Sequence, residues 1–411
     1  MAGQRDIFSC GRFPEDLSRN RWARILGEVR ERARASGEAI LDLTISNPTV
    51  AGLCWERGLV AAALSQGEIE RYCPSPRGSV VARTAIAEFY KRVHGAEIFP
   101  ERIHLTASTS EAYSWLTKLL CDGGDNILAP APSYPLIEHL CGMEGIVARN
   151  YFLNFDNNAR RWTTDFASME NAIDARTRAI FCVCPNNPTG STFNAEERGR
   201  LLALSQQRQI PLVIDEVFLE YGNGDNNATR DLKTFAGTRE APIFVLGGLS
   251  KSAALPQVKV GWIITCGEEK FVEQALVRLD FVADAYLSSS TPSQNAVPAL
   301  LAASGEIRGR IRERLDNNEK NLVAWSRMSR DAGLEILPRT AGWYSLLRLP
   351  RGVDEDALSF WLLRHENVVV HPGYFYDIPG EPAQHLALSL LTPPEVLAAA
   401  LPRIDSALRH N

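Results

Sequence analysis

The chain has 411 residues, of which 45% are hydrophobic and 23% charged, a composition that suits a globular protein large enough for two packed domains. Its formal net charge of −5 offers no basic surface for nucleic acid or an anionic membrane, and no apolar run is long enough to span a bilayer. The N-terminus is too polar for a signal peptide and the eight cysteines lack metal-ligand spacing, so we expect a cytoplasmic protein without a bound metal.

The N-terminal region predicts a helix, a short extended segment and a restricted turn. Residues 18–36 place apolar side chains such as Trp22 on one helical face and arginines on the other. An extended segment over 40–45 leads into Ser46-Asn47-Pro48-Thr49, where the proline restricts the backbone. Two prolines then stiffen a loop around Tyr72, and another amphipathic helix follows it.

Short apolar runs alternate with helical segments between residues 103 and 264. The expected strands are 103–105, 126–129, 179–183, 211–214 and 243–246. Fully apolar strands that alternate with helices indicate a mostly parallel sheet covered on both faces. Ligands of such sheets bind beyond the carboxyl ends of the strands.

Polar residues with chemical potential follow these predicted strands. They are Ser108-Thr109-Ser110, Asn187, Asp215 and Lys251. Taken singly, each has a more ordinary interpretation, such as a helix cap, a loop motif, a solvated carboxylate or a surface lysine. Their common placement at the strand ends predicts one shared site.

The chemistry of this site follows from its lysine and its aspartate. Lys251 lies between two apolar runs, where desolvation lowers the pKa of the amine and frees its lone pair to form a Schiff base. Asp215 stays ionised in a core only if a cation meets it, and a protonated pyridine ring is such a cation. A lysine Schiff base with an acidic partner at the ring nitrogen is the pattern of pyridoxal phosphate.

The C-terminal third predicts a smaller domain. A long helical region over 293–332 connects it to the sheet. The remaining expected elements are strands at 343–347, 368–371 and 385–391 and a helix over 395–408.

Several pieces of the chain occur in the order and spacing of one known family. They are Ser46-Asn47-Pro48, Tyr72 with Gly78, Asp125, Pro132-Ser133-Tyr134-Pro135, Asn187-Pro188-Thr189-Gly190, Asp215-Glu216-Val217, Ser250-Lys251 and Leu255 to Trp262. With them the chain resembles a fold-type I, pyridoxal-phosphate-dependent aminotransferase of class I/II. The resemblance implies an α/β fold with a large domain (50–292), whose mostly parallel sheet lies between helices. A smaller α+β domain would combine 1–49 with 293–411.

The resemblance also implies roles for individual residues. Lys251 would form the internal aldimine and later shuttle a proton, while Asp215 would pair with the pyridine nitrogen. Asn187 would hydrogen-bond the 3-oxygen of the ring, and Tyr134 would stack on its face. The segment Ser108 to Ser110 would cradle the phosphate.

Further implied contacts involve the phosphate, the substrate and a second subunit. Lys259 replaces the family's phosphate-binding arginine and keeps its charge. Tyr72 is similar to a residue that reaches the phosphate of the neighbouring subunit, which implies a homodimer with shared sites. Asn47 would lie among the substrate-binding residues.

Three further positions depart from the family pattern. Phe218 replaces a tyrosine that donates to the 3-oxygen, which should raise the pKa of the imine, and Gly248 replaces a phosphate-binding serine. Ala387 stands where the family carries the arginine for the substrate α-carboxylate. Either Arg77 or Arg339 then binds that carboxylate, or the substrate is not a common α-amino acid.

Three functions remain open at this point. The first is an aminotransferase acting on small amino donors and keto acids or aldehydes. The second keeps the cofactor but makes the protein a lyase, racemase or oxidase, and the missing arginine motivates it. The third is a non-catalytic pyridoxal-phosphate-binding homologue, which ranks last because Lys251, Asp215 and Asn187 are retained.

Overall fold

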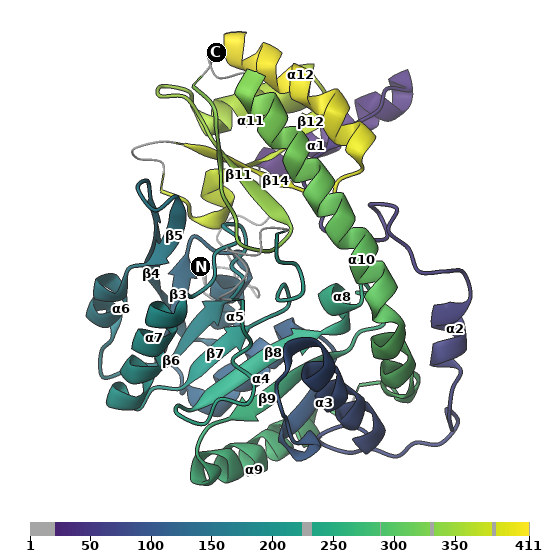
Figure 1. The fold of residues 1–411 in the computed structure, drawn as a ribbon, viewed down its shortest axis with the longest axis vertical. Helices are drawn as coiled ribbons and strands as arrows, with labels where there is room; N and C mark the ends of the chain where they lie inside the picture. The colour runs from purple at the N-terminus through teal and green to yellow at the C-terminus, as the bar shows by residue number, and fades with distance from the viewer. Residues whose placement is uncertain (1–20, 224–231, 288, 329–332, 380–383, 411) are drawn as a thin grey trace, which may run out of the picture.

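The computed structural model describes residues 21–223, 232–287, 289–328, 333–379 and 384–410. An eight-stranded sheet occupies its larger part (Figure 1). In chain order its strands are β2 (Ile103–Thr106), β3 (Asn126–Ala131), β4 (Val147–Asp156), β5 (Arg161–Thr164), β6 (Thr177–Val183), β7 (Leu212–Asp215), β8 (Ile243–Gly248) and β9 (Gly261–Cys266).

The spatial order of these strands is β2-β9-β8-β7-β6-β3-β4-β5. From β8 to β4 all neighbours are parallel, whereas β9 and β5 run against their neighbours. The predicted mostly parallel sheet is therefore confirmed. The β4–β5 pair at the edge was not predicted.

Both faces of the sheet are buried at its centre, which explains why the strands β6, β7 and β8 are mainly apolar. In β7, Leu212 and Ile214 belong to the core on one face and Val213 to the core on the other. Helices α4 (Thr109–Leu120), α5 (Leu136–Glu144) and α9 (Glu269–Tyr286) cover the face of Val213. Helices α3 (Val80–His94), α6 (Phe166–Ala172) and α7 (Ala195–Arg208) cover the opposite face.

A turn separates β6 from helix α7. The segment from Pro185 to Gly190 forms this turn and is not helical. Asn186 holds the segment as a turn, because its side-chain Oδ1 accepts from the Thr189 amide at 3.2 Å. The helix begins at Ala195, where Asn194 forms a reciprocal capping box with Glu197.

The smaller part contains a four-stranded antiparallel sheet in the order β10-β11-β14-β13. Its strands are β10 (Glu335–Leu337), β11 (Tyr344–Arg348), β13 (His371–Pro372) and β14 (His385–Ser389), and its helices are α1 (Arg21–Ser36), α11 (Glu355–His365) and α12 (Pro394–His410). The strand β1 (Leu41–Asp42) pairs in parallel with β12 (Val368–Val369), which joins the N-terminal segment to the C-terminal part.

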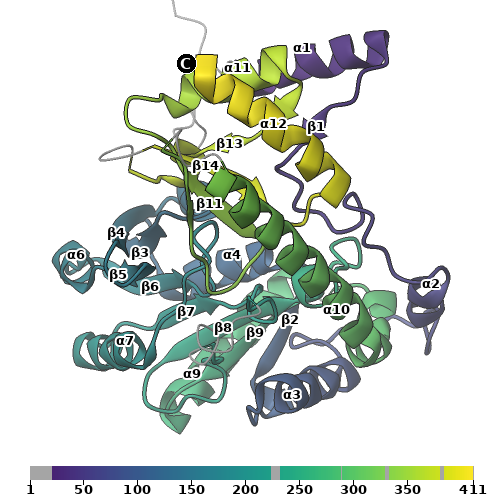
Figure 2. The ribbon, with the colours of Figure 1, turned by 45° about the horizontal axis from the view of Figure 1, so that its top comes forward.

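The helix α10 (Thr291–Met328) is 38 residues long and runs from the large sheet to the small one (Figures 1 and 2). It packs against α3 and α2 (Leu59–Leu64) near one end and against α12 and β10 near the other. The domain boundaries at residues 50 and 292 stay predictions. Residues 18–20 and 329–332 of the two predicted helices lie outside the described residues. Within the described ranges no helix combines the length and the apolar character that crossing a membrane requires.

Candidate active site

A cavity of about 210 Å³ lies at the carboxyl ends of the parallel strands. Its walls come from both parts of the molecule. The lining residues are Ser46, Thr109, Tyr113, Ser133, Tyr134, Leu136, Ile137, Val183, Asn187, Asp215, Val217, Phe218, Lys251 and Tyr344. The structure thus brings Thr109, Tyr134, Asn187, Asp215 and Lys251 together, as the sequence predicted.

Lys251 lies in the short helix α8 (Leu249–Ser252), directly after β8. Its Nζ donates to the carbonyl oxygen of Ser46 at 3.3 Å and lies 4.7 Å from the centre of the Trp343 ring. Desolvation lowers the pKa of Lys251 to about 8, although Asp215 acts in the opposite direction. A substantial fraction of the amine is therefore neutral near physiological pH, as a nucleophile requires.

Asp215 is the last residue of β7 and is buried. Its Oδ2 accepts from the Tyr113 hydroxyl at 2.8 Å, and its Oδ1 accepts from the Val217 amide at 3.0 Å. Burial raises the pKa of Asp215 to about 6 even though both donors and Lys251 lower it. Ionisation of this carboxyl is therefore harder than in water, and a further cation beside it would favour the charged form.

Two polar atoms in the cavity wall have no partner in the described part of the chain. They are the buried Oδ1 of Asn187 and the buried Oγ of Ser133. An unpaired buried polar atom costs about 1–3 kcal/mol. Together with a buried amine and a buried carboxyl, these atoms fit a flat polar group such as pyridoxal phosphate.

The start of α4 forms the end of the cavity nearest to β9. The Ser108 hydroxyl caps this helix by accepting from the Glu111 amide at 3.2 Å. The backbone of Gly261 approaches closely, since a Cβ atom there would lie 3.1 Å from the Thr109 amide nitrogen. The amides of Thr109 and Ser110 belong to the first helical turn, which has no intrahelical acceptors and favours anions.

Of the predicted cofactor and substrate ligands, Ser108, Ser110, Lys259, Tyr72 and Asn47 do not line this cavity. The Lys259 side chain is exposed, and its φ of 60° is uncommon for a residue with a side chain. Tyr72 is 72% exposed. The Asn47 Oδ1 accepts from the amide and hydroxyl of Thr49 at 3.1 and 2.8 Å, so it stabilises the local turn.

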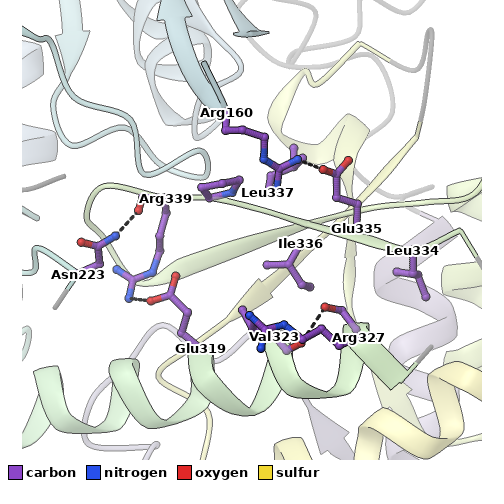
Figure 3. A pocket seen from close by; sticks show the side chains of 12 residues that line it. Arg160, Asn223, Glu319, Val323, Arg327, Leu334, Glu335, Ile336, Leu337 and Arg339 are labelled. Atoms are coloured by element: carbon purple, nitrogen blue, oxygen red, sulfur yellow. Dashed lines mark hydrogen bonds and ion pairs between the residues drawn. The ribbon is translucent and has the colours of Figure 1, made fainter. Parts of the chain in front are cut away.

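Neither of the two arginines predicted as carboxylate ligands reaches this cavity. The Arg77 guanidinium donates to both carboxylate oxygens of Asp280, at 2.7 and 2.6 Å. Figure 3 shows Arg339 in a different cavity, between α10 and β10. There it donates to Glu319 at 2.8 Å and to the Gly342 carbonyl at 3.0 Å.

Sequence reasoning missed the contributions of Tyr113, Tyr221 and Tyr344. Tyr113 lies one helical turn after Thr109, so the helical period was a signal that could have placed it on the same side. The Tyr221 hydroxyl donates to the Lys251 carbonyl at 2.5 Å. Tyr344 comes from β11 in the smaller part, and no local pattern indicated that it faces Lys251.

The family model for aminotransferase class I and II matches residues 38–404. The chain belongs to this family. It is therefore a pyridoxal-phosphate-dependent aminotransferase with the fold-type I architecture, which confirms the predicted family, enzyme class and cofactor.

Relatives and solved structures agree with this assignment. The alanine aminotransferase of Mycobacterium tuberculosis is 26% identical over 401 residues, which cover 93% of this chain and 90% of that protein. The glutamate-pyruvate aminotransferase AlaA of Escherichia coli is 25% identical over 362 residues, 86% of this chain and 87% of that protein. The structure of an alanine aminotransferase from Pyrococcus furiosus superposes with a TM-score of 0.82 at 23% identity, covering 94% of this chain and 97% of that one.

The first testable consequence concerns Phe218, whose ring centre lies 5.6 Å from the Lys251 Nζ. We expect Phe218→Tyr to add a hydroxyl donor at the 3-oxygen of the cofactor. One hydrogen bond of about 1 kcal/mol would then lower the pH midpoint of the cofactor's visible absorbance change by about one unit. A spectral titration of the loaded enzyme measures this midpoint. Phe152→Tyr, on an exposed position of β4, is the control, and an unchanged or higher midpoint in the Phe218 variant would contradict the expectation.

Proposed function

We propose that this aminotransferase works in the cavity that joins Lys251 to Asp215, on small-molecule amino donors and keto acids or aldehydes. One observation carries the proposal. The buried Asp215 carboxyl lies at the end of β7, the desolvated Lys251 amine follows the neighbouring parallel strand β8, and both groups face the same cavity. Over the whole reaction, the donor carbon exchanges its amino group and hydrogen for the carbonyl oxygen of the acceptor. The donor carbon is oxidised by two electrons and the acceptor carbon is reduced by two.

Four lining residues have specific tasks in this proposal. The bound cofactor supplies a ring that accepts the electron pair left at the substrate carbon. The Lys251 amine binds the cofactor and, when released, carries a proton at its Nζ. Asp215 holds a proton on the ring nitrogen through its carboxylate, and Asn187 orients the ring by hydrogen bonding. Tyr134 covers one ring face.

The phosphate group is assigned to the start of α4. Here the amides of Thr109 and Ser110 and the nearby hydroxyls provide donors, and the helix dipole favours negative charge. Lys259 would contribute charge from a distance, because its side chain is not part of the cavity wall. This arrangement excludes water from one end of the cofactor and fixes its orientation toward Lys251.

A half-reaction tests the function. The loaded enzyme is mixed with a panel of amino donors in the absence of an acceptor, and the cofactor spectrum is followed. We expect at least one donor to convert the cofactor stoichiometrically to its aminated form, which an added carbonyl acceptor then reverses. Release of free ammonia or of a racemised donor, without accumulation of that form, would instead identify a lyase, oxidase or racemase.

We also propose a homodimer with shared sites. Exposed apolar side chains gather where α3 begins and along α9: Val80 at 61%, Val81 at 65%, Val277 at 67% and Phe281 at 80% exposure. The Arg77–Asp280 ion pair joins these two regions. A second copy of the chain would cover this apolar surface and bring the exposed Tyr72 to the neighbouring cavity.

Phe281→Glu tests the dimer. A charge at the centre of a buried apolar interface is costly, so we expect the variant to sediment as a 45.5 kDa monomer while the wild type sediments at twice that mass. Phe152→Glu introduces the same change at an exposed position of β4 and should stay dimeric. A Phe281→Glu variant that remains dimeric would refute this interface.

A cytoplasmic location completes the proposal. The cysteines in the described part of the chain are all free, as a reducing compartment would keep them. The acidic composition and net charge of −5 support small-molecule partners rather than nucleic acid or a membrane surface.

A further inference from the structure

The Lys251 cavity has few charged side chains in its wall. Among its described lining residues, only Lys251 and Asp215 carry charge. In the proposed function both are engaged by the cofactor. The space that remains for substrate is therefore bordered by aromatic, aliphatic, hydroxyl and amide groups.

The small sheet contributes the polar part of this border. Tyr344 of β11 lines the cavity, and its hydroxyl has Ser46 and Tyr376 as hydrogen-bonding neighbours. The rings of Tyr344 and Tyr376 lie 6.1 Å apart, and the Tyr376 hydroxyl lies 3.0 Å from the Nδ1 of His371. Tyr344 is thus held by a chain of polar groups, of which Tyr376 is buried behind the cavity wall.

This chain of groups carries no positive charge at neutral pH. Burial lowers the pKa of His371 to about 4, against the opposing effect of Asp42. In the β13–β14 pairing His371 stands opposite Ala387, which also pairs with Leu346. Ala387 shares a core cluster with Leu346 and Tyr376, so the β14 residue on this side of the sheet is a methyl group.

Two candidate cations lie elsewhere and are already paired. Arg77 is held by Asp280, and Arg339 by Glu319 in the separate cavity of Figure 3. A carboxylate placed against Tyr344 would lose its hydration without gaining a counter-charge, which costs several kcal/mol. A neutral hydroxyl or carbonyl group at the same place would gain a hydrogen bond without that cost.

We propose that the preferred amino donor has no carboxylate beside its amino group, and that Tyr344 hydrogen-bonds a neutral hydroxyl or carbonyl group in its place. This inference rests on the proposed function and names its substrate class: amines of the amino-alcohol type. The donor R–CH(NH2)–CH2OH becomes R–C(=O)–CH2OH, and an aldehyde or ketone acceptor becomes the corresponding amine. The two electrons lost by the donor carbon are gained by the acceptor carbon.

Matched donor pairs test the preference. L-Alaninol with L-alanine, and L-phenylalaninol with L-phenylalanine, differ only in having a hydroxymethyl group or a carboxylate. We expect kcat/KM of the donor half-reaction to be at least about tenfold higher for the alcohol of each pair, a difference of about 1.4 kcal/mol. Equal or higher values for the acids overturn this inference but leave the proposed function standing. If no donor of either kind converts the cofactor, the proposed function fails as well.

Substitutions locate the specificity. Tyr344→Phe should lower kcat/KM for the alcohols about tenfold, mainly through KM, and leave the acids unchanged. Tyr374→Phe is the matched control, because that hydroxyl donates to Asp356 at 3.0 Å outside the cavity wall. A readout without turnover is the dissociation constant of hydroxyacetone, the ketone formed from L-alaninol, from the loaded enzyme, measured by calorimetry; this constant should rise in Tyr344→Phe only. An equal loss for alcohols and acids would make Tyr344 merely structural and overturn its assigned role.

Two more variants test whether an arginine side chain binds the substrate carboxylate. Ala387→Arg places a guanidinium on this face of β14 and should shift the preference toward the acids, with the thermal midpoint confirming that the variant folds. Arg71→Gln removes an exposed cation next to Tyr72, which the proposed dimer would bring close. If the wild type prefers the acids and Arg71→Gln loses that preference, the partner subunit supplies the clamp and the inference is wrong.

Discussion

Replacing Lys251 with alanine should abolish amino transfer, with kcat falling at least about 10³-fold. In the proposed function the amine is both the nucleophile that holds the cofactor and the base that moves the proton, so one substitution removes both actions. The other described wall residues include no second amine. Steady-state rates and the visible spectrum of the loaded protein measure the two losses separately.

The control for this variant is Lys91→Ala. Lys91 is exposed and pairs with the exposed Glu97 at 3.3 Å, a contact of small energetic value. It should keep wild-type rates and spectrum. A Lys251→Ala protein that folds, binds cofactor and retains more than a few per cent of the rate would remove Lys251 from the mechanism.

The second large effect is expected for Asp215→Asn. The amide keeps the shape, its Oδ1 can still accept from the Val217 amide and its Nδ2 can donate to the Tyr113 oxygen. It loses the charge that, in the proposed function, holds a proton on the ring nitrogen. We expect kcat to fall about 10²–10⁴-fold, the usual range for an acid–base group. Asp284→Asn, on an exposed position of α9, should have no effect.

The same variant should be more stable than the wild type when the cofactor is removed. The pKa of Asp215 is raised to about 6, so its contribution to stability is present below pH 4 and is lost as the pH rises through 6. At pH 8 the cofactor-free Asp215→Asn chain should therefore gain about 3 kcal/mol, and at pH 4 the gain should vanish. Urea unfolding at several pH values measures this, and a gain that shrinks with rising pH would contradict it.

The sequence was most informative where burial is complete. Strands β6, β7 and β8 are apolar at nearly every position, so Asp215 and Lys251 stood out at their ends and were placed correctly. Strand β4 was missed because it alternates with exposed polar residues near the edge of the sheet. Its first half, from Val147 to Asn150, has no buried residue, so the alternation that indicates a half-buried strand is short.

The arginines show what local sequence could not provide. Nothing near Arg77 or Arg339 indicated that Asp280 and Glu319, far away in the chain, would pair with them. The inward orientation of Tyr344 likewise depends on the packing of β11 between β10 and β14. Such long-range pairings are set by the tertiary structure, whereas strand ends are set by the pattern of the chain itself.

The bond from Lys251 to Ser46 links the chemistry to the architecture. Ser46 follows β1, which pairs with β12. The hydrogen bond from the Lys251 amine therefore holds the N-terminal segment 43–49 of the smaller part in place. Once the Lys251 amine is bonded to the cofactor, it no longer presents a full ammonium group to the Ser46 carbonyl. Cofactor binding should therefore make residues 43–49 more mobile. The amide hydrogens of this segment should exchange with deuterium faster in the cofactor-bound protein than in the cofactor-free protein. The segment 43–49, which borders the substrate, would then differ in mobility between the cofactor-bound and the cofactor-free protein.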